Sequence, residues 1–244
     1  MARPSTVGKY LVERIEEMCV DGLPEAEWRG HRVNQIVPAA VDPRAAPMFT
    51  TWRETLSMTK RFGVCAGSSV LIVGSGGNGL AFAAHSVNLG ARVTMVGSPR
   101  REETALGAGV REYFGYGKED LQAAVLKSVP QGFDFALDAL GRQGIADQLL
   151  GCLRPKGRLA IYGIDDFGKL SINPGLARGE FTIFPASYAE PETHQDVSEF
   201  VLQGRLRADL WYDTDKPYPL SDIAAAFEDV RRSPKPKALI RLKE

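Results

Sequence analysis

The residue types with the clearest chemistry form a glycine-rich segment that follows an apolar run and opens a helical stretch: Gly74, Ser75, Gly76, Gly77, Asn78 and Gly79. Their spacing fits the G-x-G-x-x-G pattern of turns that bind the pyrophosphate of a dinucleotide. Gly74 would allow the tight turn, Gly76 would let the backbone approach the pyrophosphate, and Gly79 would let the helix pack closely on the strand. The start of the helix would present free N–H groups and a positive dipole end to the phosphates. The alternative is a tight strand-to-helix turn that binds nothing.

The tip of the next strand decides which dinucleotide is expected. An NAD site needs an acidic residue about 20 positions after the glycines, where its carboxylate accepts from the ribose 2′-hydroxyl. This sequence has Gly97 and Ser98 instead, followed after a proline by Arg100 and Arg101. Small residues and two guanidinium groups suit a 2′-phosphate, which needs room and charge-assisted donors. The pattern favours NADP over NAD; alternatively, the arginines are a solvated helix start, where the dipole disfavours their charge.

The elements that would position these residues alternate along the chain from residue 69 onward. Strands are expected from apolar runs at 69–73, 92–96, 133–137, 158–162 and 181–184. Helices are expected between them at 80–89, 101–106, 119–128 and 143–153, and residues 154–157 are expected to form a turn. This rhythm predicts an α/β fold, a doubly wound parallel sheet of the Rossmann type with a truncated second region.

The flanks of this region have a different pattern. They predict helices at 9–18, 50–61, 193–203 and 222–230, a turn-rich segment at 213–219 and a final strand at 238–242. We therefore expect three parts: a remnant of a second domain or an N-terminal extension at 1–45, a dinucleotide-binding domain at 46–190, and C-terminal helices and a strand at 191–244.

Composition argues against several other classes of protein. The 244 residues are 44 % apolar and 25 % charged, which is ordinary for a soluble globular protein. Thirty Lys and Arg balance 30 Asp and Glu, so no general attraction to nucleic acid or to an anionic membrane is expected. No apolar run approaches ~20 residues, and the N-terminus lacks the apolar core of a signal peptide, so the expected location is cytoplasmic.

Several ordered segments resemble the medium-chain dehydrogenase/reductase family, which includes alcohol, sorbitol and threonine dehydrogenases and quinone reductases. The resemblance extends from Val37 to the C-terminus and is carried by residues 65–79, 89–93, 106–109, 133–141, 153–163 and 218–227. By this resemblance, Asp138, Ala139, Leu140 and Gly163 would line the ribose and nicotinamide part of the cofactor site. The alternative for Asp138 is a capping role at the end of its strand.

The family's N-terminal substrate domain has only a short counterpart here, because only about 60 residues precede the strand and glycine-rich fingerprint at 69–79. The Gly-His-Glu zinc motif and the cluster of closely spaced structural cysteines are absent, so no zinc ligand is carried over. Of the remaining candidates for a metal, His31, His85, His194 and Cys65, none is paired at ligand spacing. Cys65 and Cys152 are most simply interpreted as small buried residues.

The expected function is NADP(H)-dependent, zinc-independent oxidoreduction of a small carbonyl or alcohol. The proton donor is not identified, since Tyr188, His194 and Tyr212 are each more often structural than catalytic. Two alternatives stay open: a non-catalytic NADP-binding module or subunit that needs a partner chain, and a fragment of a longer dehydrogenase.

The strand expected at Phe181–Phe184 bears on assembly. By the resemblance it should lie at the edge of the sheet, and it is apolar and carries no charge. An exposed edge of this kind favours pairing with another strand, so we expect a homodimer through this edge. The alternative is a monomer whose edge is covered by the N-terminal helices.

Overall fold

The structure, a computed structural model, describes residues 35–117, 120–166 and 168–242. The chain is divided into two compact units. We call residues 58–188 the sheet unit, and residues 1–57 together with 189–244 the terminal unit. The helix expected at 9–18 lies outside the described residues, and the division into 1–45, 46–190 and 191–244 stays a prediction.

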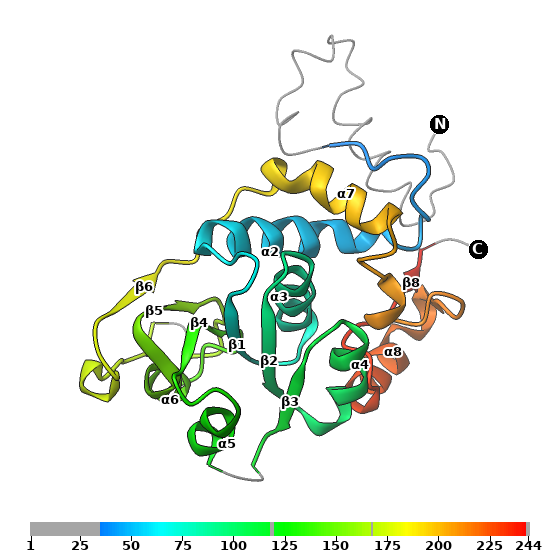
Figure 1. The fold of residues 1–244 in the computed structure, drawn as a ribbon. Helices are drawn as coiled ribbons and strands as arrows, with labels where there is room; N and C mark the ends of the chain where they lie inside the picture. Colours follow the sequence, from blue (N-terminus) through cyan, green and yellow to red (C-terminus); the bar gives the residue numbers. More distant parts are fainter. Residues whose placement is uncertain (1–34, 118–119, 167, 243–244) are drawn as a thin grey trace. The chain divides into compact units, whose positions relative to one another are not determined.

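The sheet unit is built on six parallel strands, in the order β3-β2-β1-β4-β5-β6 (Figure 1). The strands are β1 Ser69–Val73, β2 Arg92–Gly97, β3 Glu112–Gly115, β4 Phe133–Asp138, β5 Leu153–Ile161 and β6 Phe181–Phe184. The order reverses between β1 and β4, so the connections leave these neighbouring strands in opposite directions along the sheet. The predicted fold class, a doubly wound α/β sheet of the Rossmann type, is confirmed.

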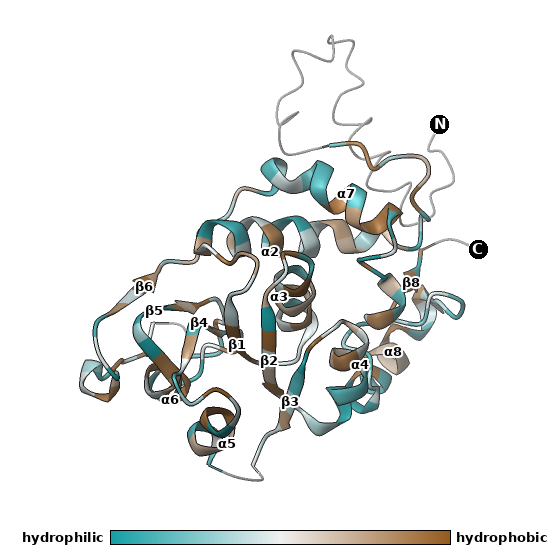
Figure 2. Ribbon diagram, viewed as in Figure 1, coloured by the Kyte–Doolittle hydropathy of each residue, from teal (hydrophilic) through white to brown (hydrophobic). Residues whose placement is uncertain are grey.

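Among the residues that the structure describes, four α-helices lie between strands of this sheet: α3 Gly77–Asn88, α4 Glu102–Gly107, α5 Leu121–Ser128 and α6 Ile145–Cys152. All of β1 is buried, and its alternate side chains serve opposite faces. Leu71 and Val73 belong to the core cluster that includes Val125 of α5 and Leu149 of α6. The colouring of Figure 2 is accordingly brown over much of the inner strands β1 and β2.

Three expectations for individual elements were wrong. Strand β3 was not predicted, because its four residues, EYFG, are only half-buried and include a charge. Residues 154–157, expected as a turn, belong to β5, where they form an irregularity in the pairing with β4. The final strand is shorter than expected: β8 comprises only Ile240–Arg241 and pairs in parallel with β7, Tyr218–Pro219, inside the segment expected to be turn-rich.

The described residues of the terminal unit form helices, loops and this one strand pair. Its helices are α7 His194–Leu202, α8 Ile223–Arg232 and the first part of α2 Phe49–Phe62, close to the predicted bounds. Short 3-10 helices throughout the chain lie at Ala46–Met48, Pro99–Arg101, Pro174–Leu176, Glu190–Thr193, Ala208–Leu210 and Leu220–Asp222. Trp52 meets Trp211 edge-on at 5.4 Å between ring centroids, and both are fully buried. No helix among the described residues is long and apolar enough to cross a membrane.

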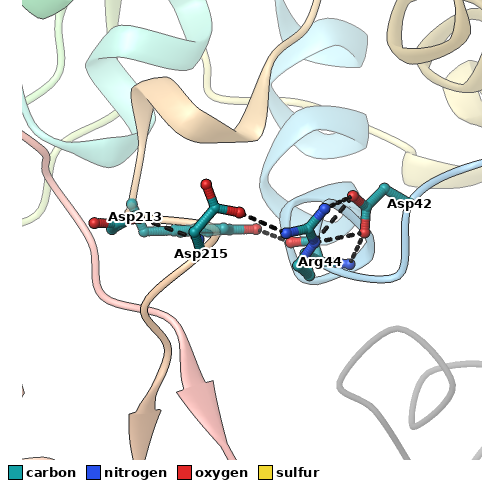
Figure 3. Close-up of polar contacts among 5 residues, drawn as sticks. Asp42, Arg44, Asp213 and Asp215 are labelled. Atoms are coloured by element: carbon teal, nitrogen blue, oxygen red, sulfur yellow. Dashed lines mark hydrogen bonds and ion pairs between the residues drawn. The ribbon is translucent and has the colours of Figure 1, made fainter.

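One polar cluster ties the two sequence segments of the terminal unit together (Figure 3). Arg44 pairs with Asp42 at 2.6 Å and with Asp215 at 2.7 Å. Tyr212, which is buried, donates from its hydroxyl to the carbonyl oxygen of Arg44 at 2.7 Å. The Tyr212 hydroxyl therefore links the two sequence segments through the backbone of Arg44.

Candidate functional site

The glycine-rich turn joins β1 to α3 in the geometry that its pattern predicts. Gly74 has φ +115°, and its N–H donates to the carbonyl oxygen of Val96 at 2.8 Å. A Cβ on Gly79 would lie 1.8 Å from the carbonyl oxygen of Gly74, so only glycine fits there. A Cβ on Gly76 would meet nothing within 4 Å, and this residue is exposed. Two glycines therefore satisfy the packing of the turn, while Gly76 leaves open space above it.

Helix α3 begins in this turn. Gly76 is its N-cap and makes no side-chain capping hydrogen bond. Helix N–H groups of this kind seek an acceptor, and with the helix dipole they favour an anion. The adjoining Asn78 is held by Tyr162, since its side-chain amide donates to the Tyr162 hydroxyl at 2.9 Å. The turn can thus bind a phosphate with backbone donors alone.

Asp138 ends β4 directly beside the end of β1, at the point where the strand order reverses. It is fully buried, and its Oδ1 accepts from the N–H groups of Leu140 and Gly141, both at 2.9 Å. Its Oδ2 accepts no hydrogen bond from the described residues. Burial raises the pKa of this carboxyl, against the lowering effect of the two backbone donors. Asp138 therefore shapes the loop after β4, as its capping alternative proposed.

The loops after β4 and β5 are in close contact. A Cβ on Gly163 would lie 1.9 Å from the carbonyl carbon of Leu140. The N–H of Gly163 also donates to the carbonyl oxygen of Asp138 at 3.1 Å, and that of Ala139 donates to Val73 at 2.8 Å. The four residues expected on the ribose and nicotinamide side are thus brought together beside the glycine-rich turn.

The tip of β2 is filled by neighbouring side chains. A Cβ on Gly97 would lie 2.2 Å from Ser75 Oγ and 2.4 Å from the Tyr113 hydroxyl. The same two groups bind the backbone of Ser98: its N–H donates to Ser75 Oγ at 3.0 Å, and its carbonyl accepts from the Tyr113 hydroxyl at 2.6 Å. A side chain at Gly97 would therefore have to displace Ser75 or Tyr113.

The two arginines follow this tip directly. Arg100 is exposed, and its Nε donates to Ser98 Oγ at 3.1 Å. Arg101 is half-buried, and its pKa is lowered first by burial and then by the positive charge of Arg100. Two like charges beside each other, one of them partly desolvated, are stabilised by an anion placed between them.

Tyr113 and Tyr116 were not found from the sequence, because β3 itself was not predicted. Burial raises the pKa of Tyr113 and raises that of Tyr116 to about 12, so both are neutral donors near pH 7. They line a cleft of about 680 Å³ that also includes Val73, Val96, Glu102 and Gln148. This cleft lies at the carboxyl ends of β1, β2 and β3, where ligands bind in open parallel sheets.

Comparisons with known proteins agree with this geometry. A family model described as "Zinc-binding dehydrogenase" matches residues 77–203. The chain belongs to this zinc-binding dehydrogenase family. It is 26 % identical over 207 residues to L-galactonate-5-dehydrogenase of Escherichia coli strain K12, a match that covers 83 % of this chain and 60 % of that protein.

Solved structures show the same fold. The alcohol dehydrogenase zinc-binding domain protein of Burkholderia ambifaria superposes with a TM-score of 0.76 at 22 % identity, over 88 % of this chain and 60 % of that one. The 2R,3R-butanediol dehydrogenase of Bacillus subtilis gives 0.75 at 21 % identity, over 85 % and 60 %. The chain thus spans about 60 % of the length of these relatives.

The metal candidates that the structure describes, His85, His194 and Cys65, form no metal-binding group. No group of three His, Cys, Asp or Glu that could hold a metal ion occurs among the described residues. His85 is fully buried inside α3, and His31 lies outside the described residues. Cys152 is buried as expected, but Cys65 is exposed, so that expectation was wrong.

The candidate proton donors lie outside the cleft that Tyr113 and Tyr116 line. His194 Nε2 contacts the carbonyl oxygen of Ile36 at 2.9 Å, and its ring packs on Phe49. Burial lowers the pKa of this imidazole. Tyr188 is 45 % exposed. Neither residue is assigned a role in chemistry.

Proposed function

We propose that this chain binds NADP(H) and serves the oxidoreduction of a small carbonyl or alcohol. The observation that carries the proposal is the tip of β2, where Ser75 and Tyr113 fill the space of a side chain at Gly97. With that space filled, position 97 supplies no carboxylate to a ribose 2′-hydroxyl. Arg100 and Arg101 follow at the same tip and supply charge-assisted donors for a 2′-phosphate.

Each part of the site would have a separate task. The N-terminus of α3 and the open space at Gly76 would hold the pyrophosphate. Asp138 would keep the loop of Ala139 and Leu140 in place under the ribose and nicotinamide. When bound, the nicotinamide supplies the hydride, and the protein supplies orientation and exclusion of water. We assign the proton-donating step to no residue of this chain.

The proposal includes three further features. This chain contributes no zinc ligand, in keeping with the lack of the family's zinc motif in its sequence. It is a cytoplasmic protein that binds a small-molecule substrate and neither nucleic acid nor membrane, in keeping with its balanced charge. It forms a homodimer through the edge strand β6, whose Ile183 is 48 % exposed.

A second function is favoured by the length comparison. Because the chain spans about 60 % of its relatives, it could act as an NADP-binding module or subunit beside a partner chain, or as part of a longer dehydrogenase. The two functions share the cofactor site and differ in turnover. A purified chain that binds NADPH but reduces no aldehyde or ketone in a broad panel would support the second function over the first.

The cofactor preference is tested by measuring NADPH and NADH affinities by calorimetry. The Arg100→Ala plus Arg101→Ala variant should lose about 1–3 kcal/mol of NADPH binding per charge-assisted hydrogen bond, with NADH affinity little changed. Arg231→Ala, which removes an exposed arginine of α8 paired with Glu228, is the matched control. Equal affinities of the unmutated chain for the two cofactors would overturn the proposal.

A further inference from the structure

A second cleft, of about 450 Å³, lies at the opposite end of the same strands, where the chain enters the sheet. Residues at or near the starts of β1, β2, β4 and β5 line it, among them Ser69, Arg92, Asp134 and Arg154. Since β1 runs from Ser69 to Val73, its two ends are about 13 Å apart at ~3.3 Å per residue. This amino-edge cleft is therefore separate from the proposed dinucleotide site.

The amino-edge cleft has a large excess of positive charge. Four cations line it, Arg92, Arg154, Lys156 and Arg158, against the single carboxylate of Asp134. That carboxylate is already engaged, because it pairs with Arg154 and accepts from the N–H and Oγ of Ser69, both at 2.7 Å. The side chains of Arg92 and Lys156 have no ion pair or hydrogen bond with any residue that the structure describes.

The guanidinium group of Arg158 is held in place by contacts with Phe62 and Phe184. One Nη donates to the carbonyl oxygen of Phe62, and the guanidinium lies 5.8 Å from the Phe62 ring centroid and 5.4 Å from that of Phe184. A guanidinium has five N–H donors, so most of its donors remain available to an anion. Its position is fixed before a ligand arrives, which reduces the ordering cost of binding.

The backbone around Lys156 is strained. Lys156 has φ +66°, the one non-glycine residue in the left-handed region among residues 35–117, 120–166 and 168–242. It sits in the irregular part of β5, where Phe133 pairs with Leu153 but Phe135 pairs with Arg158. Glycine adopts this conformation without steric cost, whereas lysine adopts it with backbone strain and places a positive charge at this position. Bulges and strain of this kind occur beside binding sites.

We propose that the amino-edge cleft binds a multivalent phosphate anion, as inorganic pyrophosphate or as the phosphate group of a small metabolite, through Arg92, Lys156 and Arg158. Planar guanidinium groups match the geometry of phosphate oxygens, and the lysine adds a point charge. This binding is independent of the dinucleotide and holds whichever cofactor the chain prefers.

Cys65 gives a local readout, because it is exposed and lines the same cleft. The experiment measures alkylation of Cys65 in the full chain by peptide mass spectrometry, using neutral iodoacetamide and anionic iodoacetate. Pyrophosphate should slow both reactions saturably, at an ionic strength held constant with sodium chloride. Inorganic phosphate and glycerol phosphate are the further arms, and they distinguish the free anion from an ester.

Two variants make the test specific. Lys156→Gly removes the charge and fits the left-handed backbone, so it should fold well, and Arg92→Gln changes an exposed residue. Each variant should lower the ratio of the iodoacetate rate to the iodoacetamide rate about threefold, because removing one charge ~7 Å from the thiol in water has an effect of this size. Each should also weaken the protection of Cys65 by pyrophosphate. Lys127→Gln, an exposed lysine of α5, should change neither quantity.

The Arg100→Ala plus Arg101→Ala variant separates this proposal from the function proposed above, because it should leave Cys65 protection intact. The proposal is overturned if pyrophosphate protects Cys65 no better than sodium chloride. It is equally overturned if Lys156→Gly and Arg92→Gln retain full protection, since the anion would then bind elsewhere. Protection by an acidic peptide without protection by pyrophosphate would assign the cleft to a protein partner and reject the phosphate site.

Discussion

The Tyr113 hydroxyl donates to the carbonyl oxygen of Ser98 at 2.6 Å and so connects β3 to the tip of β2. The same hydroxyl lies where a side chain on Gly97 would begin. With Ser75 it fixes the backbone from which Arg100 and Arg101 extend. One tyrosine therefore blocks the position of an acidic residue and holds the position of the two arginines.

We predict that Tyr113→Phe weakens NADPH binding more than NADH binding. The variant keeps the ring but removes the donor to Ser98, so the tip of β2 loses one hydrogen bond and the arginines lose part of their support. Loss of a hydrogen bond should lower the free energy of unfolding by about 0.5–1.5 kcal/mol. Calorimetry with both cofactors and urea unfolding measure the two effects. Tyr188→Phe, at an exposed tyrosine, is the control; an unchanged NADPH-to-NADH affinity ratio in Tyr113→Phe argues against a positioning role.

Two glycines of the turn should respond to alanine in opposite ways. Gly79→Ala places a Cβ 1.8 Å from the Gly74 carbonyl oxygen, so it should destabilise the fold by about 3 kcal/mol, more than the ~1 kcal/mol gained from helix propensity. Gly76→Ala meets nothing within 4 Å, so its unfolding free energy should change by less than about 1 kcal/mol.

Binding separates the two variants further. Gly76→Ala should fold normally and still bind NADPH more weakly, because the methyl group occupies the space proposed for the pyrophosphate. Thermal unfolding and calorimetry on both proteins provide the measurements. If Gly76→Ala binds as tightly as the unmutated chain, the pyrophosphate does not approach this turn.

Asp138→Asn should change the dependence of stability on pH. Burial raises the pKa of Asp138 above its ordinary value of 3.8, so the folded state prefers the protonated carboxyl. The wild-type chain then loses stability, relative to the variant, as pH rises from about 3.8 through the raised folded pKa. Asparagine keeps an oxygen for the N–H groups of Leu140 and Gly141 but carries no charge.

The expected result is a variant at least as stable as the wild-type chain at pH 7, with the difference shrinking toward pH 4. Urea unfolding at several pH values measures it. A variant that is less stable at pH 7 and recovers in acid would mean that the ionised carboxylate is favoured in the folded state, the reverse of the assigned direction.

Sequence patterns predicted the inner strands because strands buried on both faces are continuous apolar runs, as in Val70 to Val73. The glycine-rich turn was also predictable from the sequence. Its glycines are required by the geometry of the backbone, which depends little on the surrounding side chains. Asp138 was found only through a family resemblance, and its burial and its two backbone donors became visible in the structure.

The missed residues depend on tertiary contacts. Strand β3 is short and half-buried, so its pattern is weak, and Tyr113 and Tyr116 were missed with it. Gly97 was interpreted as the absence of an acid and as room for a 2′-phosphate, because no local pattern reports that Ser75 and Tyr113 fill its space. Cys65 was expected to be buried on residue type alone, whereas its turn at the start of the sheet leaves it exposed.

The last prediction concerns the free edge of the sheet. β6 pairs only with β5 among the described strands, and both Thr182 and Ile183 in it are exposed. A parallel edge with apolar side chains and no charge favours pairing with an identical edge about a two-fold axis. Ile183→Lys should therefore convert a dimer to a monomer in light scattering at micromolar concentration. Leu106→Lys, at a leucine of similar exposure, 46 % against 48 %, should leave the mass unchanged. An unmutated chain that is already monomeric, or a dimer that persists in Ile183→Lys, rules out this interface.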